Sequence, residues 1–157
     1  MNREILFRGK RKDNGEWVTG NYVCAKEARG EYGIEKKDFH VIIPFCFDEN
    51  MPQDDVIVKG ETVGQYTGLK DKNGVKIFEG DVVRVSYKDT GGISGEGIVI
   101  FESGNFGVRY VGLYAQMNGE GIDLLSGITF EGYETVVEVT GNTHDNPELL
   151  GAVWETK

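Results

Sequence analysis

The chain has 157 residues, of which 39% are hydrophobic and 27% are charged, and these ordinary globular proportions exclude wholesale disorder. Its 23 glycines are about twice the usual share of roughly 7% and follow no three-residue period, which excludes collagen and disfavours a mainly helical chain. The net charge of −9 disfavours a general duplex-binding surface, because such a surface needs cations that displace condensed counterions.

Strands joined by turns are predicted along most of the chain, because short alternating or apolar runs recur between glycine, Asn-Gly and aspartate-rich breaks. The predicted strands cover residues 4–7, 17–24, 39–47, 56–59, 62–67, 76–78, 81–87, 97–101, 107–111 and 135–139. Alternation in the seventh of these places Val83 and Val85 on one face and Arg84 on the other. Residues 98–101 are apolar on both faces, so this strand should lie near the centre of its sheet.

Helix is expected only as short turns. Asn146-Pro147-Glu148 is a helix start signal, and Leu149-Leu150-Gly151 limits it to about one turn. Residues 122–126 are a second candidate turn. The sequence therefore predicts an all-β protein, mainly β with one or two short helical turns.

Charge is divided unevenly along the chain. Residues 1–40 contain nine Lys or Arg and seven Asp or Glu, whereas residues 41–157 contain eight and nineteen. The densest basic run is Arg8, Lys10, Arg11 and Lys12. Because this run borders Asn14-Gly15, we favour a solvated hairpin tip over a nucleic-acid site.

Catalytic and metal-binding patterns receive little support. The two cysteines and two histidines show no recognised zinc spacing, and no P-loop is present. His144 next to Asp145 is interpreted as a satisfied or solvent-facing histidine rather than a catalytic pair, and Cys46 between two phenylalanines as a buried hydrophobe rather than a nucleophile. We predict no catalytic residue, no metal and no cofactor.

A membrane location is not expected. No stretch approaches the roughly 18 apolar residues of a membrane span, and the N-terminus leads into no long apolar signal region. The expectation is a cytoplasmic protein without a membrane partner.

Three blocks of sequence carry a family resemblance. Residues 65–74 (QYTGLKDKNG) followed by 77–83 (IFEGDVV) resemble the signature of the YopX family. Residues 3–8 with Trp17-Val18 are similar to the opening of that family, and residues 138–143 with 145–150 to its ending. The resemblance implies a β-rich, oligomeric protein of bacteriophages and prophages, located in the bacterial cytoplasm, with no established catalytic activity to carry over. Residues 88–130 match no family block, so partner specificity could lie there.

The signature has two interpretations, and we favour the structural one. In it, Tyr66 and Leu69 pack beneath a hairpin, residues 70–72 keep its tip solvated, and Asn73-Gly74 forms the turn. The alternative is that the residues before the tip form an exposed recognition surface. The candidate interaction residues are therefore Gln65, Tyr66 and Thr67 of the signature together with Arg8, Lys10, Arg11 and Lys12 of the basic run.

The predicted organisation is a single YopX-like chain, 1–157, with a β-rich N-terminal subdomain over 1–62. Residues 63–157 are predicted to form the signature hairpin and an SH3-like small barrel, because a meander of strands runs from residue 81 to 139. The leading functional hypothesis is a non-enzymatic, homo-oligomeric interaction module that binds an unknown phage or host protein. The alternatives are a nucleic-acid-binding or DNA-mimic regulator and, least favoured, an enzyme of unknown type.

Overall fold

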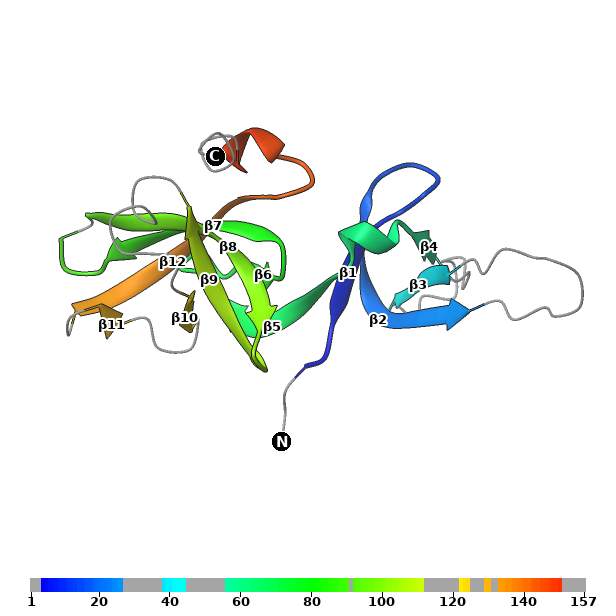
Figure 1. Ribbon diagram of the computed structural model, residues 1–157, viewed down its shortest axis with the longest axis horizontal. Helices are drawn as coiled ribbons and strands as arrows, with labels where there is room; N and C mark the ends of the chain where they lie inside the picture. The colour runs from blue at the N-terminus through cyan, green and yellow to red at the C-terminus, as the bar shows by residue number, and fades with distance from the viewer. Residues whose placement is uncertain are drawn as a thin grey trace, which may run out of the picture. The chain divides into compact units, whose positions relative to one another are not determined.

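The computed structural model describes residues 4–26, 38–44, 56–90, 92–111, 122–124, 129–130 and 133–150 (Figure 1). These residues form antiparallel strands and two short 3-10 turns, which confirms the predicted all-β fold. The strands are β1 Phe7–Lys10, β2 Trp17–Lys26, β3 Asp38–Pro44, β4 Val56–Val58, β5 Gly64–Lys70, β6 Lys76–Phe78, β7 Asp81–Tyr87, β8 Ile93–Glu102, β9 Asn105–Val111, β10 Ile122–Leu124, β11 Thr129–Phe130 and β12 Tyr133–Asn142. The 3-10 turns are η1 Gly60–Thr62 and η3 Pro147–Leu150.

Contacts within the chain divide it into two compact units. The N-terminal unit comprises Met1–Tyr66 and the C-terminal unit Thr67–Lys157. Strand β5 begins in the first unit, where it pairs with β1, and its later residues lie in the second, where its partner is β6. The expected boundary between residues 62 and 63 falls slightly before this division.

The N-terminal unit is a curled antiparallel sheet. Its strands follow the order β4-β3-β2-β1-β5. The sheet curls enough that β4 meets the end of β1, where Arg11 forms an isolated bridge with Val58. The backbone N–H of Lys12 donates to the Ile57 oxygen at 3.0 Å, and that of Lys59 donates to the Lys10 oxygen at 2.8 Å. One face of the sheet is thereby enclosed as an interior.

Small residues allow the enclosed face to pack closely. Ile42 and Val58 are fully buried there. A Cβ atom at Gly9 would lie 3.1 Å from Val58, and one at Gly20 would overlap the backbone of Ile43. A side chain at Gly20 would therefore collide with the neighbouring strand, and one at Gly9 would crowd Val58.

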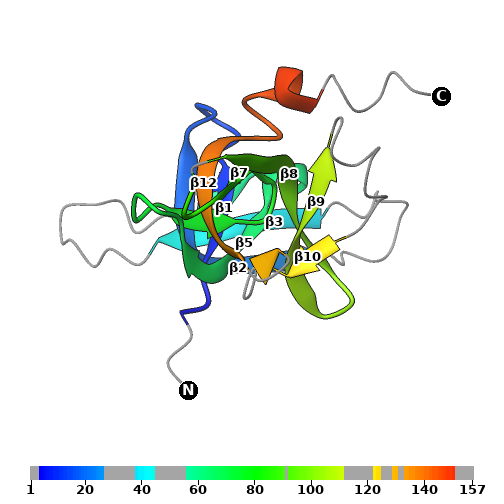
Figure 2. The same ribbon diagram turned by 90° about the vertical axis from the view of Figure 1, so that its left-hand side faces the viewer.

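The C-terminal unit is a meander with one returning strand. Its strand order is β10-β9-β8-β7-β12-β11, and strands β12, β7, β8, β9 and β10 are labelled in Figure 2. Its core consists of Ile77, Val83, Val85, Val99, Val108 and Tyr110. The predicted burial of Val83 and Val85 is confirmed, and so is the internal position of β8, which lies between β7 and β9. The described pairings do not close the strand order, so the SH3-like barrel stays a prediction.

Several local predictions need correction. Residues 122–124 form strand β10 rather than the start of a helical turn, and residues 60–62 form a 3-10 turn just before β5. Phe101, at the end of the otherwise central strand β8, has 50% of its surface exposed. The short turn after Asn146 is confirmed as η3. Cys46 lies outside the described residues.

Candidate functional site

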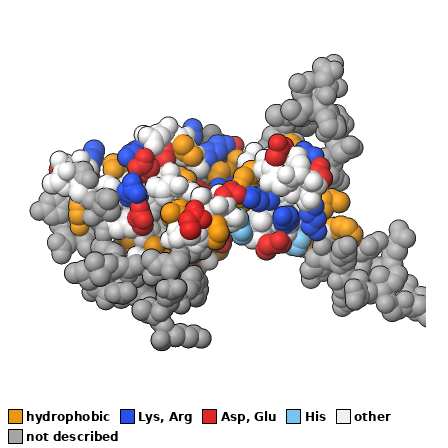
Figure 3. Space-filling model, turned by 90° about the horizontal axis from the view of Figure 1, so that it is seen from above, with side chains coloured by type: hydrophobic (Ala, Val, Ile, Leu, Met, Phe, Trp, Pro, Cys, Tyr) orange, Lys and Arg blue, Asp and Glu red, His pale blue; other side chains and the backbone are white. Residues whose placement is uncertain are grey.

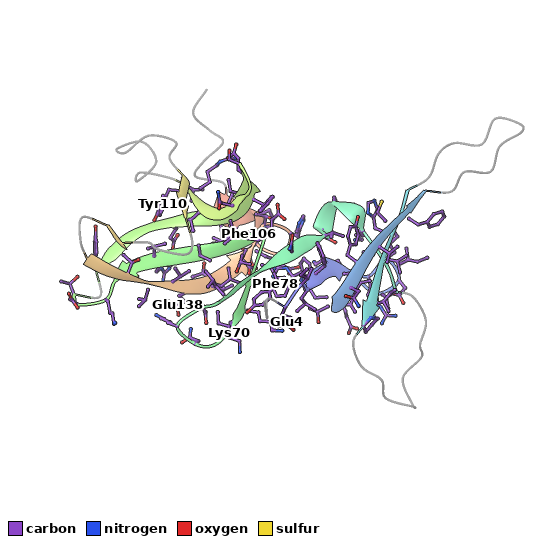
Figure 4. All side chains as sticks on the ribbon, turned by 90° about the horizontal axis from the view of Figure 1, so that it is seen from below. Glu4, Lys70, Phe78, Phe106, Tyr110 and Glu138 are labelled. Atoms are coloured by element: carbon purple, nitrogen blue, oxygen red, sulfur yellow. The ribbon has the colours of Figure 1, made fainter. Side chains whose placement is uncertain are left out.

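The tip of the β5–β6 hairpin is organised by a buried carboxylate. Asp71 Oδ1 accepts hydrogen bonds from the backbone N–H groups of Asn73 at 2.8 Å and Val75 at 2.9 Å. Its Oδ2 accepts the backbone N–H of Val139 in β12 at 3.1 Å. Figure 4 shows this hairpin, marked by Lys70, beside Glu138 of β12. The prediction of a solvated tip is therefore wrong for Asp71, although Lys70 and Lys72 are exposed.

The environment of Asp71 favours its charged form. Burial alone would raise the pKa of this carboxyl, but the backbone N–H groups of Val139, Val75 and Asn73 outweigh burial and hold the pKa below its ordinary value. A second link to β12 is the ion pair between Lys72 Nζ and Glu138 Oε2 at 2.9 Å. The backbone N–H of Lys72 also donates to the Val137 oxygen at 3.0 Å, so several neighbouring contacts fasten the hairpin tip to β12.

The second half of the signature turns the chain into β7. Asp81 is almost fully buried, and its Oδ2 accepts the backbone N–H of Phe78 at 2.7 Å. Gly80 has a φ of 81°, and it donates its N–H to the Val99 oxygen at 2.8 Å. Its own oxygen accepts the N–H of Thr143 at 2.9 Å, so the signature also holds the C-terminal block in place.

The C-terminal block is a turn built by asparagine side chains. Asn142 Oδ1 accepts the backbone N–H groups of His144 at 3.0 Å and Asp145 at 2.9 Å. Asn146 Oδ1 accepts the N–H of Asn142 at 3.3 Å. A Cβ atom at Gly141 would overlap Asn146 Oδ1, so a side chain there would displace this oxygen from the N–H of Asn142. The polar residues of both blocks thus serve the fold.

The predicted recognition residues of the signature offer little surface. Tyr66 and Thr67 are 4% and 8% exposed, and the Thr67 hydroxyl donates to the Ile77 oxygen at 2.9 Å. Gln65 is half-buried and lies opposite Phe7 in the β1–β5 pairing. Leu69, which was expected to pack beneath the hairpin, is 37% exposed.

The residues of the basic run have different surroundings, since Arg8 and Lys10 lie within β1 and Arg11 follows its last residue. Arg8 and Lys10 both lie over the Trp17 ring, with the Arg8 Cζ atom 4.7 Å and the Lys10 Nζ atom 5.5 Å from its centroid. Arg11 instead donates two hydrogen bonds to Asp13, and the side-chain hydrogen bond from Arg11 lowers the pKa of Asp13 to about 2. The prediction of a solvated hairpin tip fits the Arg11–Asp13 pair, whereas Arg8 and Lys10 form a cation–π cluster.

An aliphatic surface lies on the side of the N-terminal sheet that faces away from its enclosed interior. In the strand register, Val23 is opposite Val41, and Val41 is opposite Ile57, so these side chains form one row across β2, β3 and β4. Val23 and Ile57 are 44% and 43% exposed, and Ile43, two residues from Val41 on the same side, is 41% exposed. We call these four residues the outer row. Figure 3 shows Lys and Arg side chains gathered on this unit, with hydrophobic side chains nearby.

The outer row is not apparent from the sequence pattern. The runs that contain it, VIIP and VIV, are apolar on both sides and give no sign of which side is covered. The one available signal was that strands apolar on both sides are expected to have both faces of their sheet covered.

The two histidines lie in different surroundings. His40 Nδ1 lies 2.6 Å from the hydroxyl of Tyr22, whose ring stacks on the imidazole at 6.0 Å. A Cβ atom at Gly60 would collide with the His40 ring, so the imidazole packs directly on this glycine. His144 is exposed in the C-terminal turn.

The described residues were also searched for metal-binding groups and for membrane-spanning helices. These residues contain no group of three or more His, Cys, Asp or Glu side chains arranged to hold a metal ion. None of the helical segments in the described part of the chain is long and apolar enough to span a membrane.

One of three comparisons with known proteins identifies a family. The family model described as YopX protein matches residues 6–151. The solved structures include a similar chain, protein EF1440 from Enterococcus faecalis, with 25% identity and a TM-score of 0.46 over 94% of this chain and 98% of that one. The curated proteins contain no match.

Proposed function

The chain belongs to the YopX family, and from that membership and the geometry above we propose a non-catalytic interaction module of phage or prophage origin. It assembles with itself and binds a partner protein in the bacterial cytoplasm. The partner binds the outer row and the cations beside it.

The exposed outer row is the observation that carries this proposal. Single exposed hydrophobic residues are common on soluble proteins, whereas a continuous row across neighbouring strands is typical of an interaction site. Val23, Ile43 and Ile57 each keep more than two fifths of their surface exposed although they lie in regular strands. Covering them would remove apolar surface from water, at about 25 cal/mol per Å².

The structural use of the signature supports a role without catalysis. Asp71 and Asp81 are the buried carboxylates of the described residues, and backbone N–H groups donate to both. Asn142 and Asn146 are likewise engaged with backbone groups of their own turn. The residues that distinguish the family therefore stabilise the fold, and the function is assigned to the surface that this fold presents.

Self-association is proposed to involve the ends of the sheets. Among the described strands, β4 and β6 end one sheet order, β10 and β11 end the other, and each is only two or three residues long. A terminal strand presents backbone N–H and C=O groups that another copy can pair with. This proposal agrees with the oligomeric assembly that the family resemblance implies.

Sedimentation velocity of the full chain tests the assembly over about a hundredfold range of concentration. We expect the sedimentation coefficient to rise with concentration in the wild type and in a Val23→Thr/Ile57→Thr variant alike, because the outer row is reserved for another protein. A monomer at every concentration would remove self-association from the proposal.

Affinity capture from phage-infected bacteria tests the partner binding. A protein that binds the outer row should be retained by the wild type and by Val75→Thr, which alters an exposed valine of the C-terminal unit. It should be lost with Val23→Thr/Ile57→Thr. Retention of the same proteins by all three would contradict the assignment of function to the outer row.

A further inference from the structure

We propose that the outer row and the cations next to it bind a protein segment that carries aliphatic side chains flanked by carboxylates. This inference rests on the proposed function and names the chemistry of the partner. It is based on the residues where β4 meets the end of β1, a line that we call the seam, because the outer row reaches this line at Ile57.

Lysines surround the Ile57 end of the outer row. Lys59 follows Ile57 by two residues in extended backbone, with φ −74° and ψ 116°, so the two side chains lie on the same side. The backbone hydrogen bonds across the seam place Lys10 opposite Lys59 and Lys12 opposite Ile57. Lys12 and Lys59 are exposed. Ile57, which is 43% exposed, thus has Lys12 opposite it, and the Lys10–Lys59 pair follows two positions along the same side of the seam.

The cation–π cluster extends this basic border along β1. Lys10 is opposite Trp17 in the β1–β2 register, and Arg8, two residues away, lies on the same side of β1. Both cations are placed over the indole ring of Trp17 in β2, which holds their charged groups at the outer surface where β1 and β2 pair. The border therefore consists of Arg8, Lys10, Lys12 and Lys59, and its charge is opposite to the net charge of −9 of the whole chain.

Charge complementarity predicts the sign of the charge that the partner carries. Carboxylates on a partner would be attracted to a border of cations and would guide the encounter, whereas a basic partner would be repelled by it. A partner with carboxylates beside its apolar residues satisfies both the row and its border.

The outer row favours a protein over a nucleic acid. Single-stranded nucleic acids are bound by cations together with aromatic side chains that stack on the bases. Val23, Val41, Ile43 and Ile57 are branched aliphatic residues, which suit aliphatic side chains of another protein. The ring of Trp17 is already in contact with two cations.

Selection from a displayed library of random peptides on the immobilised full chain tests the inference. We expect the enriched peptides to combine Ile, Leu or Val with Asp or Glu. A synthetic copy of an enriched peptide should bind Val23→Thr/Ile57→Thr about tenfold more weakly than wild type, and Lys10→Glu/Lys59→Glu about tenfold more weakly as well. Val75→Thr is the matched control and should bind like wild type.

Each other result overturns the inference in a distinct way. Enriched peptides that need the outer row but lack acidic residues would contradict the partner chemistry and leave the proposed function in place. Peptides that bind Val23→Thr/Ile57→Thr with the same affinity as wild type would contradict the location of the site. Tight binding of a single-stranded oligonucleotide that Lys10→Glu/Lys59→Glu abolishes would assign the border to nucleic acid. Conversion of an oligomer to a monomer by Val23→Thr/Ile57→Thr would assign the row to a second copy.

Discussion

The carboxylate of Asp71 accepts the backbone N–H of Val139 at 3.1 Å, and this bond joins the tip of the β5–β6 hairpin to strand β12 across 68 positions of sequence. The same carboxylate also holds the hairpin turn through Asn73 and Val75. One side chain of the signature therefore fixes a local turn and a long-range contact together.

Asp71→Asn should destabilise the C-terminal unit by about 1–3 kcal/mol, because the new amide cannot accept at both of its ends. Either the turn or Val139 then faces an N–H donor in place of an acceptor. Urea unfolding measures the free energy, and hydrogen exchange of the Val139 amide reports the local bond. Asp89→Asn, an exposed control, should change neither measurement. Equal stability of the two variants would contradict the assigned role.

The contribution of Asp71 should depend on pH. Its pKa in the folded protein lies below the ordinary value of 3.8, so the charged form is the one that folding stabilises. The stabilisation is present above about pH 4 and is lost as the pH falls through the lowered pKa. The difference in unfolding free energy between wild type and Asp71→Asn should therefore shrink as the pH falls from about 6 to below about 4. A constant difference over this range would show that charge plays no part.

Gly20→Ala should destabilise the N-terminal unit far more than Gly15→Ala does. A Cβ atom at Gly20 overlaps the backbone of Ile43, and a paired strand cannot move away at low cost. Gly15 has a φ of 76° in open space, so its alanine variant carries only a conformational cost of about 1–2 kcal/mol. Thermal unfolding of both variants measures the contrast. Similar losses would contradict the close approach of β2 and β3.

Tyr22→Phe should cost about 0.5–1.5 kcal/mol, because the variant keeps the ring that stacks on His40 but loses the hydroxyl that lies 2.6 Å from its Nδ1. Denaturant unfolding followed in the N-terminal unit measures this change. A variant as stable as the wild type would show that the hydroxyl exchanges its partner for water at no cost.

Local sequence patterns predicted the positions of strands more reliably than they predicted the roles of polar side chains. The strands at 76–78 and 81–87 match the structure because glycine and aspartate punctuate alternating apolar residues there. Asp71 was placed in solvent because it stands between two lysines in a turn. Its burial depends on β12, which is distant in sequence, and local pattern contains no information about that neighbour.

The outer row was missed for a related reason. Val41, Ile42 and Ile43 are consecutive apolar residues, and only the strand pairing shows that Ile42 is fully buried while Ile43 is 41% exposed. The basic run was identified, but the pairing of Arg8 and Lys10 with Trp17 depends on the register of β1 and β2. The sequence was therefore sufficient to identify the basic run, whereas the strand pairing was needed to identify the outer row that it borders.

Binding of the enriched acidic, aliphatic peptide to Val23→Thr/Ile57→Thr, compared with Val75→Thr, tests the central claim most directly. The outer row predicts affinity about tenfold lower in the first variant and unchanged in the second. Equal affinity in both variants would contradict the assignment of function to this surface.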